Sequence, residues 1–208
     1  RAFGENYLQE ALDKIAACRD GRSAPAAGRE AIEPPGRQVL EWPGHEVLEW
    51  PEREVLEWHF IGPIQSNKTR PIAEHFDWVH SVDRDKIARR LSEQRPGSLP
   101  PLNVCVQVNV SGEASKSGCA PDEALDLART VAALPGLRLR GVMSIPEPTP
   151  GIGHQRARFA AVRAVFEQLR ADGLDVDTLS MGMSDDLEAA IAEGSTCVRV
   201  GTALFGRR

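Results

Sequence analysis

Outside residues 21–56 the chain alternates short apolar segments with helical segments, and this alternation limits the folds that it can adopt. Strands that alternate with helices form a parallel sheet with right-handed crossovers. A closed barrel of this type needs eight strands, and we count seven. We therefore predict an α/β fold, a (β/α)8 TIM-type barrel that lacks its first βα unit. The expected strands are residues 2–4, 58–62, 78–82, 103–110, 137–145, 178–180 and 196–201. The expected helices are residues 6–19, 67–76, 84–94, 121–133, 154–172 and 187–193.

Length and composition indicate one domain over residues 1–208. The chain has 208 residues, 41% of them hydrophobic, and a net charge of −5, which gives no basic surface for nucleic acid. No apolar run reaches the roughly 18 residues of a membrane span. The four cysteines show no CxxC spacing, so we expect free thiols and a cytoplasmic protein. The sequence begins without Met and without a signal peptide, and we take it as truncated at its N-terminus.

Residues 39–62 contain three copies of one octad, which begin at Val39, Val47 and Val55. One interpretation is a recognition module that presents tryptophans. The other is a tandem duplication on the surface, and we favour it because solenoid repeats need about 20 to 50 residues to bury a face. Only the third copy runs into an expected strand. We therefore predict a surface insertion over residues 21–56.

Two turns rich in small residues follow the last two expected strands. Ser180, Gly182 and Ser184 lie at the first turn, and Gly201 and Thr202 lie at the second. Such turns present backbone N–H groups and hydroxyls to anions. In (β/α)8 barrels the loops after the last two strands are the usual phosphate site. The sequence therefore predicts a phosphorylated ligand, the alternative being that Ser184 only caps the next helix.

Four further residues are candidates for ligand contacts, each with a structural alternative. Arg199 is expected to face the barrel interior and to donate to a ligand, or else to pair with a core carboxylate. Met143 suits contact with a flat ring but equally suits the core. Lys116 lies on a loop and is expected to be solvated rather than to meet an anion. Asn6 follows a strand end, where it would contact a ligand or cap a helix.

Six motifs in this order resemble those of the pyridoxal phosphate homeostasis protein family, small single-domain proteins with the alanine-racemase-like barrel. Together they cover nearly all of the chain outside residues 21–56. Each is weak alone, and the six in order are specific. The motifs are residues 3–7, 59–62 with 65–68, 115–118, 140–146, 180–186 and 199–206.

The resemblance implies pyridoxal 5'-phosphate (PLP) bound at the mouth of the barrel. Ser184, Gly201 and Thr202 would hold the phosphate, and Arg199 would face the pyridine nitrogen. The residues that would line the ring are Asn6, Met143 and Ser180. We assign no catalytic residue and no metal ligand.

The resemblance also implies a role in intracellular PLP homeostasis. The protein would hold PLP and deliver it, to PLP-dependent apoenzymes among other recipients, as a monomer and without turnover. One alternative is an amino-acid racemase of the same fold, and another is a non-functional fragment.

Two departures from the family pattern matter. In the family a lysine at the end of the first strand forms the Schiff base with PLP. The matching stretch is absent here, and we expect Lys14, Lys68, Lys86 and Lys116 to lie on helices or loops. The octad insertion is the second departure, and we expect it on the side opposite the site.

Overall fold

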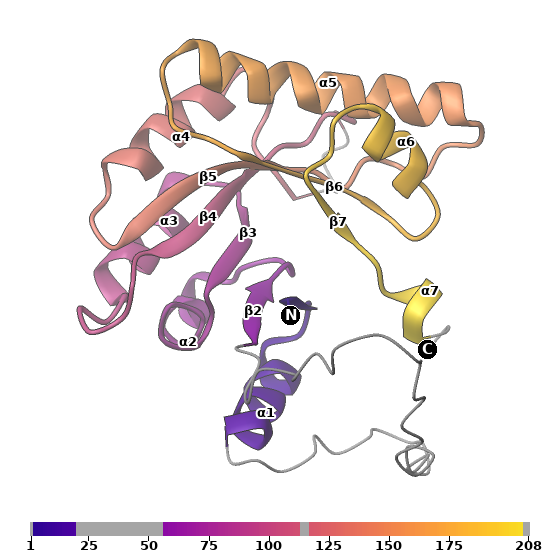
Figure 1. Cartoon of the computed structure of the whole chain (residues 1–208). Coiled ribbons are helices and arrows are strands. Elements are labelled where there is room, and N and C mark those ends of the chain that lie inside the picture. Colours follow the sequence, from indigo (N-terminus) through magenta and orange to yellow (C-terminus); the bar gives the residue numbers. More distant parts are fainter. Residues whose placement is uncertain (1, 20–55, 113–116, 206–208) are drawn as a thin grey trace, which may run out of the picture.

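The computed structural model describes residues 2–19, 56–112 and 117–205. Seven parallel strands form one curved sheet in chain order, β1 to β7, like a barrel that is not fully closed (Figure 1). The strands are β1 Ala2–Glu5, β2 Glu57–Phe60, β3 Trp78–Val82, β4 Leu102–Gln107, β5 Leu137–Met143, β6 Thr178–Met183 and β7 Cys197–Arg199. The number, order and direction of the strands confirm the predicted α/β barrel.

The helices α2 to α6 lie on the outer face of the sheet (Figure 1). None of the helices in the described ranges is long and apolar enough to cross a membrane. The helices are α1 Leu8–Arg19, the 3-10 helix η1 Ser66–Lys68, α2 Thr69–His75, α3 Asp85–Gln94, α4 Ala124–Ala133, α5 Ile152–Ala171, α6 Leu187–Ala192 and α7 Thr202–Phe205.

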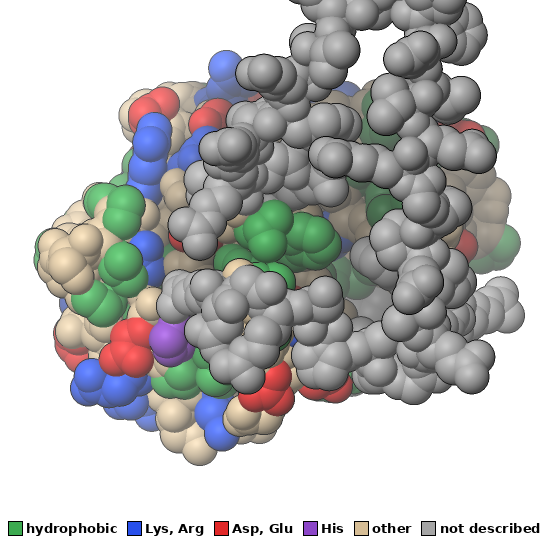
Figure 2. Space-filling view, turned by 60° about the horizontal axis from the view of Figure 1, so that its bottom comes forward, with side chains coloured by type: hydrophobic (Ala, Val, Ile, Leu, Met, Phe, Trp, Pro, Cys, Tyr) green, Lys and Arg blue, Asp and Glu red, His purple; other side chains and the backbone are tan. Residues whose placement is uncertain are grey.

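The sheet has two edges, β1 and β7, which do not pair with each other in the described structure. Apolar side chains are exposed on both, with Phe3 on β1 and Val198 on β7 each 37% exposed. Figure 2 shows apolar side chains gathered near the middle of the face on the side of α1. Unpaired edges of this kind are sites where another chain can add a strand.

Several element ends differ from the sequence prediction. The strand expected to stop at residue 180 continues to Met183, because Met183 pairs with Arg199 on β7 after a register irregularity that includes Gly182, whose φ is 94°. The helix expected from residue 121 begins at Ala124, since residues 121–123 form a turn in which the Ala120 N–H donates to Glu123. The short helix α7 was not predicted, because four residues leave no periodic pattern.

The predicted surface insertion lies almost wholly outside the described residues. The first two octads fall within residues 20–55, of which nothing is described. The third octad does run into a strand, because it contains β2. The predicted position of the insertion stays a prediction.

The two faces of the sheet have opposite character. On β4, Leu102, Val104 and Val106 belong to the apolar core beneath the helices. The alternate residues, Asn103 and Gln107 among them, face the barrel interior, because successive side chains of a strand point to opposite faces. Barrel interiors are usually filled by bulky branched apolar side chains. Here the interior is largely polar.

Candidate functional site

The turns after β6 and β7 lie side by side at the carboxyl ends of these strands. Ser184 Oγ accepts a hydrogen bond of 3.2 Å from the backbone N–H of Ala203. Ser184 is partly buried, whereas Gly201 and Thr202 are exposed. The two turns predicted for a phosphate are therefore in direct contact. Phosphate binding there stays a prediction.

The structure does not support Ser184 as a simple helix cap. Helix α6 begins at Leu187 and is preceded by Asp186. Asp186 Oδ1 accepts a hydrogen bond of 2.6 Å from the Met183 N–H and so closes the turn. This frees the Ser184 hydroxyl to contact the neighbouring turn instead.

Gly182 has a structural reason to be glycine. Its φ of 94° is one that side chains rarely adopt, and a Cβ there would lie 2.5 Å from the Cβ of Ala190 on α6. The absence of a side chain lets α6 pack directly against the end of β6. Gly182 is itself buried, so its contribution to the site is the shape of the turn.

Arg199 lies at the end of β7 and points into the barrel. Its Nη1 donates to Ser180 Oγ at 2.6 Å, and its Nη2 donates to the Ser144 carbonyl at 3.0 Å. No carboxylate of the described residues forms an ion pair with it, and its partners there are a hydroxyl and a carbonyl instead. A guanidinium has five N–H donors, and these two bonds use only two of them. Burial lowers the pKa of Arg199 from its ordinary value.

Two histidines, the buried His80 and the partly buried His59, lie in series with Ser180. His80 Nδ1 lies 2.9 Å from Ser180 Oγ, and His80 Nε2 lies 2.8 Å from His59 Nδ1. Burial lowers the pKa of His80 to about 3, and the charges of His59 and Arg199 act in the same direction. Burial also lowers the pKa of His59. Both rings are therefore neutral at physiological pH.

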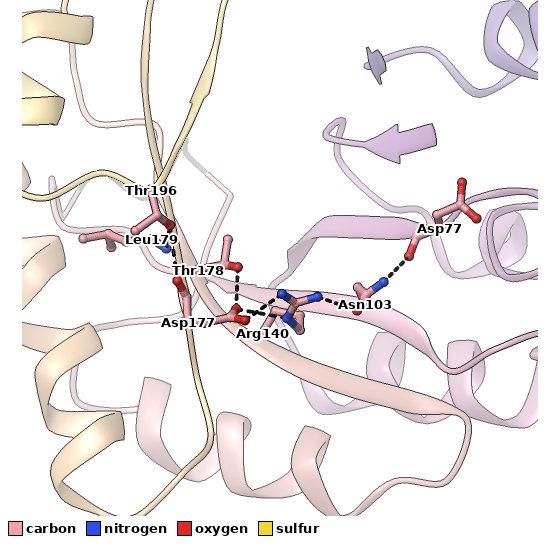
Figure 3. Close-up of polar contacts among 7 residues, drawn as sticks. All are labelled: Asp77, Asn103, Arg140, Asp177, Thr178, Leu179 and Thr196. Atoms are coloured by element: carbon pink, nitrogen blue, oxygen red, sulfur yellow. Dashed lines mark hydrogen bonds and ion pairs between the residues drawn. The ribbon is translucent and has the colours of Figure 1, made fainter. Parts of the chain in front are cut away.

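A second polar cluster, here called the floor, lies in the interior near the starts of β4 and β6 (Figure 3). Arg140 on β5 makes a bidentate ion pair with Asp177, at 3.0 Å from Nε and 2.6 Å from Nη2, and donates to Asn103 on β4 at 2.9 Å. The guanidinium carbon also lies 4.4 Å from the centre of the Trp78 ring. The pair lowers the pKa of Asp177 and raises that of Arg140. These contacts tie β3, β4, β5 and the start of β6 together.

Comparison with known proteins places this chain in a family. The family model for the N-terminal domain of alanine racemase matches residues 1–208. The Pseudomonas aeruginosa pyridoxal phosphate homeostasis protein is 60% identical over 208 residues, which are all of this chain and 75% of that protein. This chain belongs to the pyridoxal phosphate homeostasis protein family. The Escherichia coli member is 48% identical, and the match covers 76% of its length.

Solved structures of the family share the fold. PipY of Synechococcus elongatus, solved without PLP, has a TM-score of 0.76 at 34% identity, over 99% of this chain and 82% of PipY. PipY has also been solved with PLP bound, and this structure has a TM-score of 0.73 at 32% identity. The alanine racemase of Corynebacterium glutamicum, at 15% identity and a TM-score of 0.64, shares the fold alone.

Met143 and Asn6, two residues that the family resemblance assigns to the ring of PLP, lie in separate places. Met143 is fully buried at the end of β5, between Gln107 on β4 and Ser180 on β6 in the strand register. Asn6 is exposed in the loop after β1, and no described hydrogen bond joins it to the other predicted site residues. Its carbonyl packs against Gly62, where a Cβ would lie 2.1 Å from the Asn6 oxygen. Ligand contacts by Met143 and Asn6 stay predictions.

Three of the four lysines lie on helices, as the sequence predicted. Lys14 on α1 pairs with Glu5 at 2.7 Å, Lys68 ends η1 and Lys86 lies on α3. Lys116 lies outside the described residues. None of the three described lysines projects from the end of a strand.

The sequence analysis missed His59 and His80. A signal was present, because Trp58 and Phe60 alternate with His59, and Val79 precedes His80. Since Trp58, Phe60 and Val79 lie in the apolar core, the histidines between them must face the interior. Their hydrogen bonds, however, join positions up to 100 residues apart in the sequence, and no local pattern reports such contacts.

Proposed function

We propose that the chain binds PLP at the carboxyl ends of β5, β6 and β7 and acts in intracellular PLP homeostasis by holding the cofactor and passing it on. The observation that carries this proposal is the contact between Ser184 and the Ala203 N–H. It joins the turn after β6 to the turn after β7, which begins two residues beyond Arg199. The PLP-bound PipY structure supports the same ligand.

The residues at this spot suit the chemical groups of PLP. The Ser184 and Thr202 hydroxyls and the N–H groups of Gly201 and Thr202 would hold the phosphate, within a turn that Gly182 shapes. Arg199 would direct an unused N–H toward the pyridine nitrogen, which is an acceptor when unprotonated. Met143, Ser180 and Asn6 would complete the surroundings of the ring.

We propose that the chain holds PLP without turning over a substrate. When bound, PLP supplies an electron sink, and an arginine opposite its pyridine nitrogen weakens that sink by leaving the nitrogen unprotonated. A racemase also needs bases whose pKa lies near the working pH. His80, the nearest imidazole to Arg199 through Ser180, has a pKa of about 3 and cannot serve as one.

We further propose that the protein works in the cytoplasm as a monomer and delivers PLP to PLP-dependent apoenzymes. The four free cysteines, Cys18, Cys105, Cys119 and Cys197, suit a reducing compartment. The exposure of Gly201 and Thr202 leaves the phosphate end of the site open to exchange.

The test is a titration of the chain with PLP, followed by absorbance. Replacing Ser184 with Ala and Thr202 with Val removes two hydroxyl donors, each worth about 1.5–3 kcal/mol to a charged group, so affinity should fall by roughly a hundredfold or more. A matched control replaces Ser98 with Ala and Thr130 with Val, which lie on a turn and on α4 on the outside of the molecule. Equal affinity of the two double variants would show that the phosphate binds elsewhere.

A further inference from the structure

A continuous series of side-chain contacts, here called the column, runs through the interior from Arg140 in the floor to Arg199. The Arg140 guanidinium lies over Trp78, and the Trp78 ring stacks on His59 with 5.2 Å between centroids and 8° between planes. His59 then contacts His80, as described above, and the column continues through Ser180 to Arg199. It crosses five strands, β5, β3, β2, β6 and β7. Arg199, which would face the pyridine nitrogen, is thus connected to the floor, the polar cluster around Arg140 that Figure 3 shows.

The hydrogen-bonding capacities of these groups fix the direction of each bond. Arg199 can only donate, so Ser180 Oγ accepts from it. The Ser180 proton then has an acceptor in His80 Nδ1, which requires His80 to carry its proton on Nε2 and to donate to His59 Nδ1. Among the groups of Ser180, His80 and His59, this arrangement leaves one without a described partner, the His59 Nε2–H; the Trp78 Nε1–H of the column also lacks one. The opposite tautomer would leave both the Ser180 proton and His59 Nε2 without one.

Ordinary packing does not account for a histidine at position 80. A neutral imidazole that is 1% exposed costs free energy unless it is hydrogen-bonded, and an aliphatic side chain would fill the same space without that cost. What the imidazole adds is an acceptor for the Ser180 proton. With that proton held, the Ser180 lone pairs face the guanidinium.

We propose that His80 is a positioning residue that, through Ser180, aims the Arg199 guanidinium at the pyridine nitrogen of PLP, with His59 and Trp78 bracing the His80 ring. The inference rests on the proposed function, because it assigns a role relative to bound PLP. It adds two histidines, His59 and His80, that touch no ligand atom themselves.

The experiment compares two substitutions of His80 in the full chain. His80→Leu removes the acceptor, whereas His80→Gln keeps an acceptor for Ser180 and a donor for His59. Loss of one oriented donor to a buried acceptor predicts about a tenfold weaker PLP affinity for H80L, with an absorption spectrum of bound PLP displaced from that of the wild type. H80Q should stay within about threefold of the wild type and keep its spectrum.

Two controls separate positioning from stability. Val79→Ala truncates the neighbouring residue on the opposite, core face of β3, and it should lower the melting temperature without moving the spectrum. H80L with the affinity and spectrum of the wild type would overturn the proposal, and so would H80Q that loses as much as H80L. A spectral change in V79A equal to that in H80L would also overturn it, because the effect would then be general loosening.

A readout without PLP distinguishes this inference from the proposed function. Nitrogen NMR of the histidine rings at neutral pH should show His80 neutral with its proton on Nε2. The substitution Ser180→Ala should shift the Nδ1 resonance of His80. A protonated His80 or the opposite tautomer would refute the hydrogen-bond chain. A wild-type chain that binds no PLP would contradict the proposed function, whatever the NMR result, and with it the aiming of Arg199 at PLP.

Discussion

The two faces of the sheet use their buried side chains differently. The outer face packs apolar residues such as Val79, Val104 and Val106 beneath the helices, and none of the three is exposed. The inner face buries His80 and Ser180 to the same degree but joins them by directed hydrogen bonds. Apolar packing tolerates exchange of similar side chains, whereas a hydrogen-bonded interior depends on each partner. The outer face therefore mainly stabilises the fold, and the inner face determines the geometry of the site.

The largest expected effect comes from truncating a large side chain on the outer face, which tests whether the two faces act independently. Phe159 on α5 is 1% exposed within the apolar core, and Phe159→Ala should cost about 3–5 kcal/mol in the free energy of unfolding. Urea denaturation followed by circular dichroism measures this cost. Under conditions where the variant is still folded, its PLP spectrum should match that of the wild type. A changed spectrum would show that the two faces are not separable.

The next largest effect is expected at Gly182, where the end of β6 packs against α6. Gly182→Ala forces a side chain into a left-handed backbone conformation and against Ala190, at a cost of about 2–4 kcal/mol. Gly201→Ala is the matched control, because no atom lies within 4 Å of a Cβ built there, and its stability should change by less than about 0.5 kcal/mol. Thermal and urea unfolding of both variants decide the point. Equal costs would mean that α6 does not need the close approach at Gly182.

A smaller, pH-dependent effect is expected at the floor of the interior. Asp177→Asn breaks the bidentate pair with Arg140, and because Asp177 is 56% exposed the loss should be only about 1 kcal/mol. Arg140 lowers the pKa of Asp177, so this stabilisation is present above the pKa of the unfolded chain and is lost as the pH falls through the folded value. The unfolding free energies of wild type and D177N should therefore differ near pH 6 and converge below about pH 4. A constant difference across this range would assign the effect to packing instead.

Much of the fold could be predicted from the sequence because local patterns specify it. The strand β3 was predicted with its observed bounds, since its aromatic and β-branched residues are flanked by polar ones. The end of β6 was not, because it lies at Gly182, which packs directly against α6, and this close approach is a tertiary contact that the local sequence does not show. The two turns were predicted from Ser184 and Thr202, which lie at consecutive strand ends. Their direct contact through Ala203 could only be seen in three dimensions.

The interior column was beyond sequence reasoning for a different reason. Arg199 could be placed inside the barrel by alternation, but the partners expected for it were a ligand or, as the alternative, a core carboxylate. The structure supplies a hydroxyl and a carbonyl instead, from Ser180 and Ser144, which lie 19 and 55 residues away. Such partners are set by the strand register across β5, β6 and β7, which no single segment of the sequence records.

The central claim is that PLP lies across the two turns with its ring toward Arg199. A crystal structure of the chain grown with PLP tests this most directly. We predict the phosphate between Ser184 and Thr202, and the pyridine nitrogen within hydrogen-bonding distance of the Arg199 guanidinium. Density for PLP elsewhere, or a phosphate in the turns with the ring directed away from Arg199, would contradict the account.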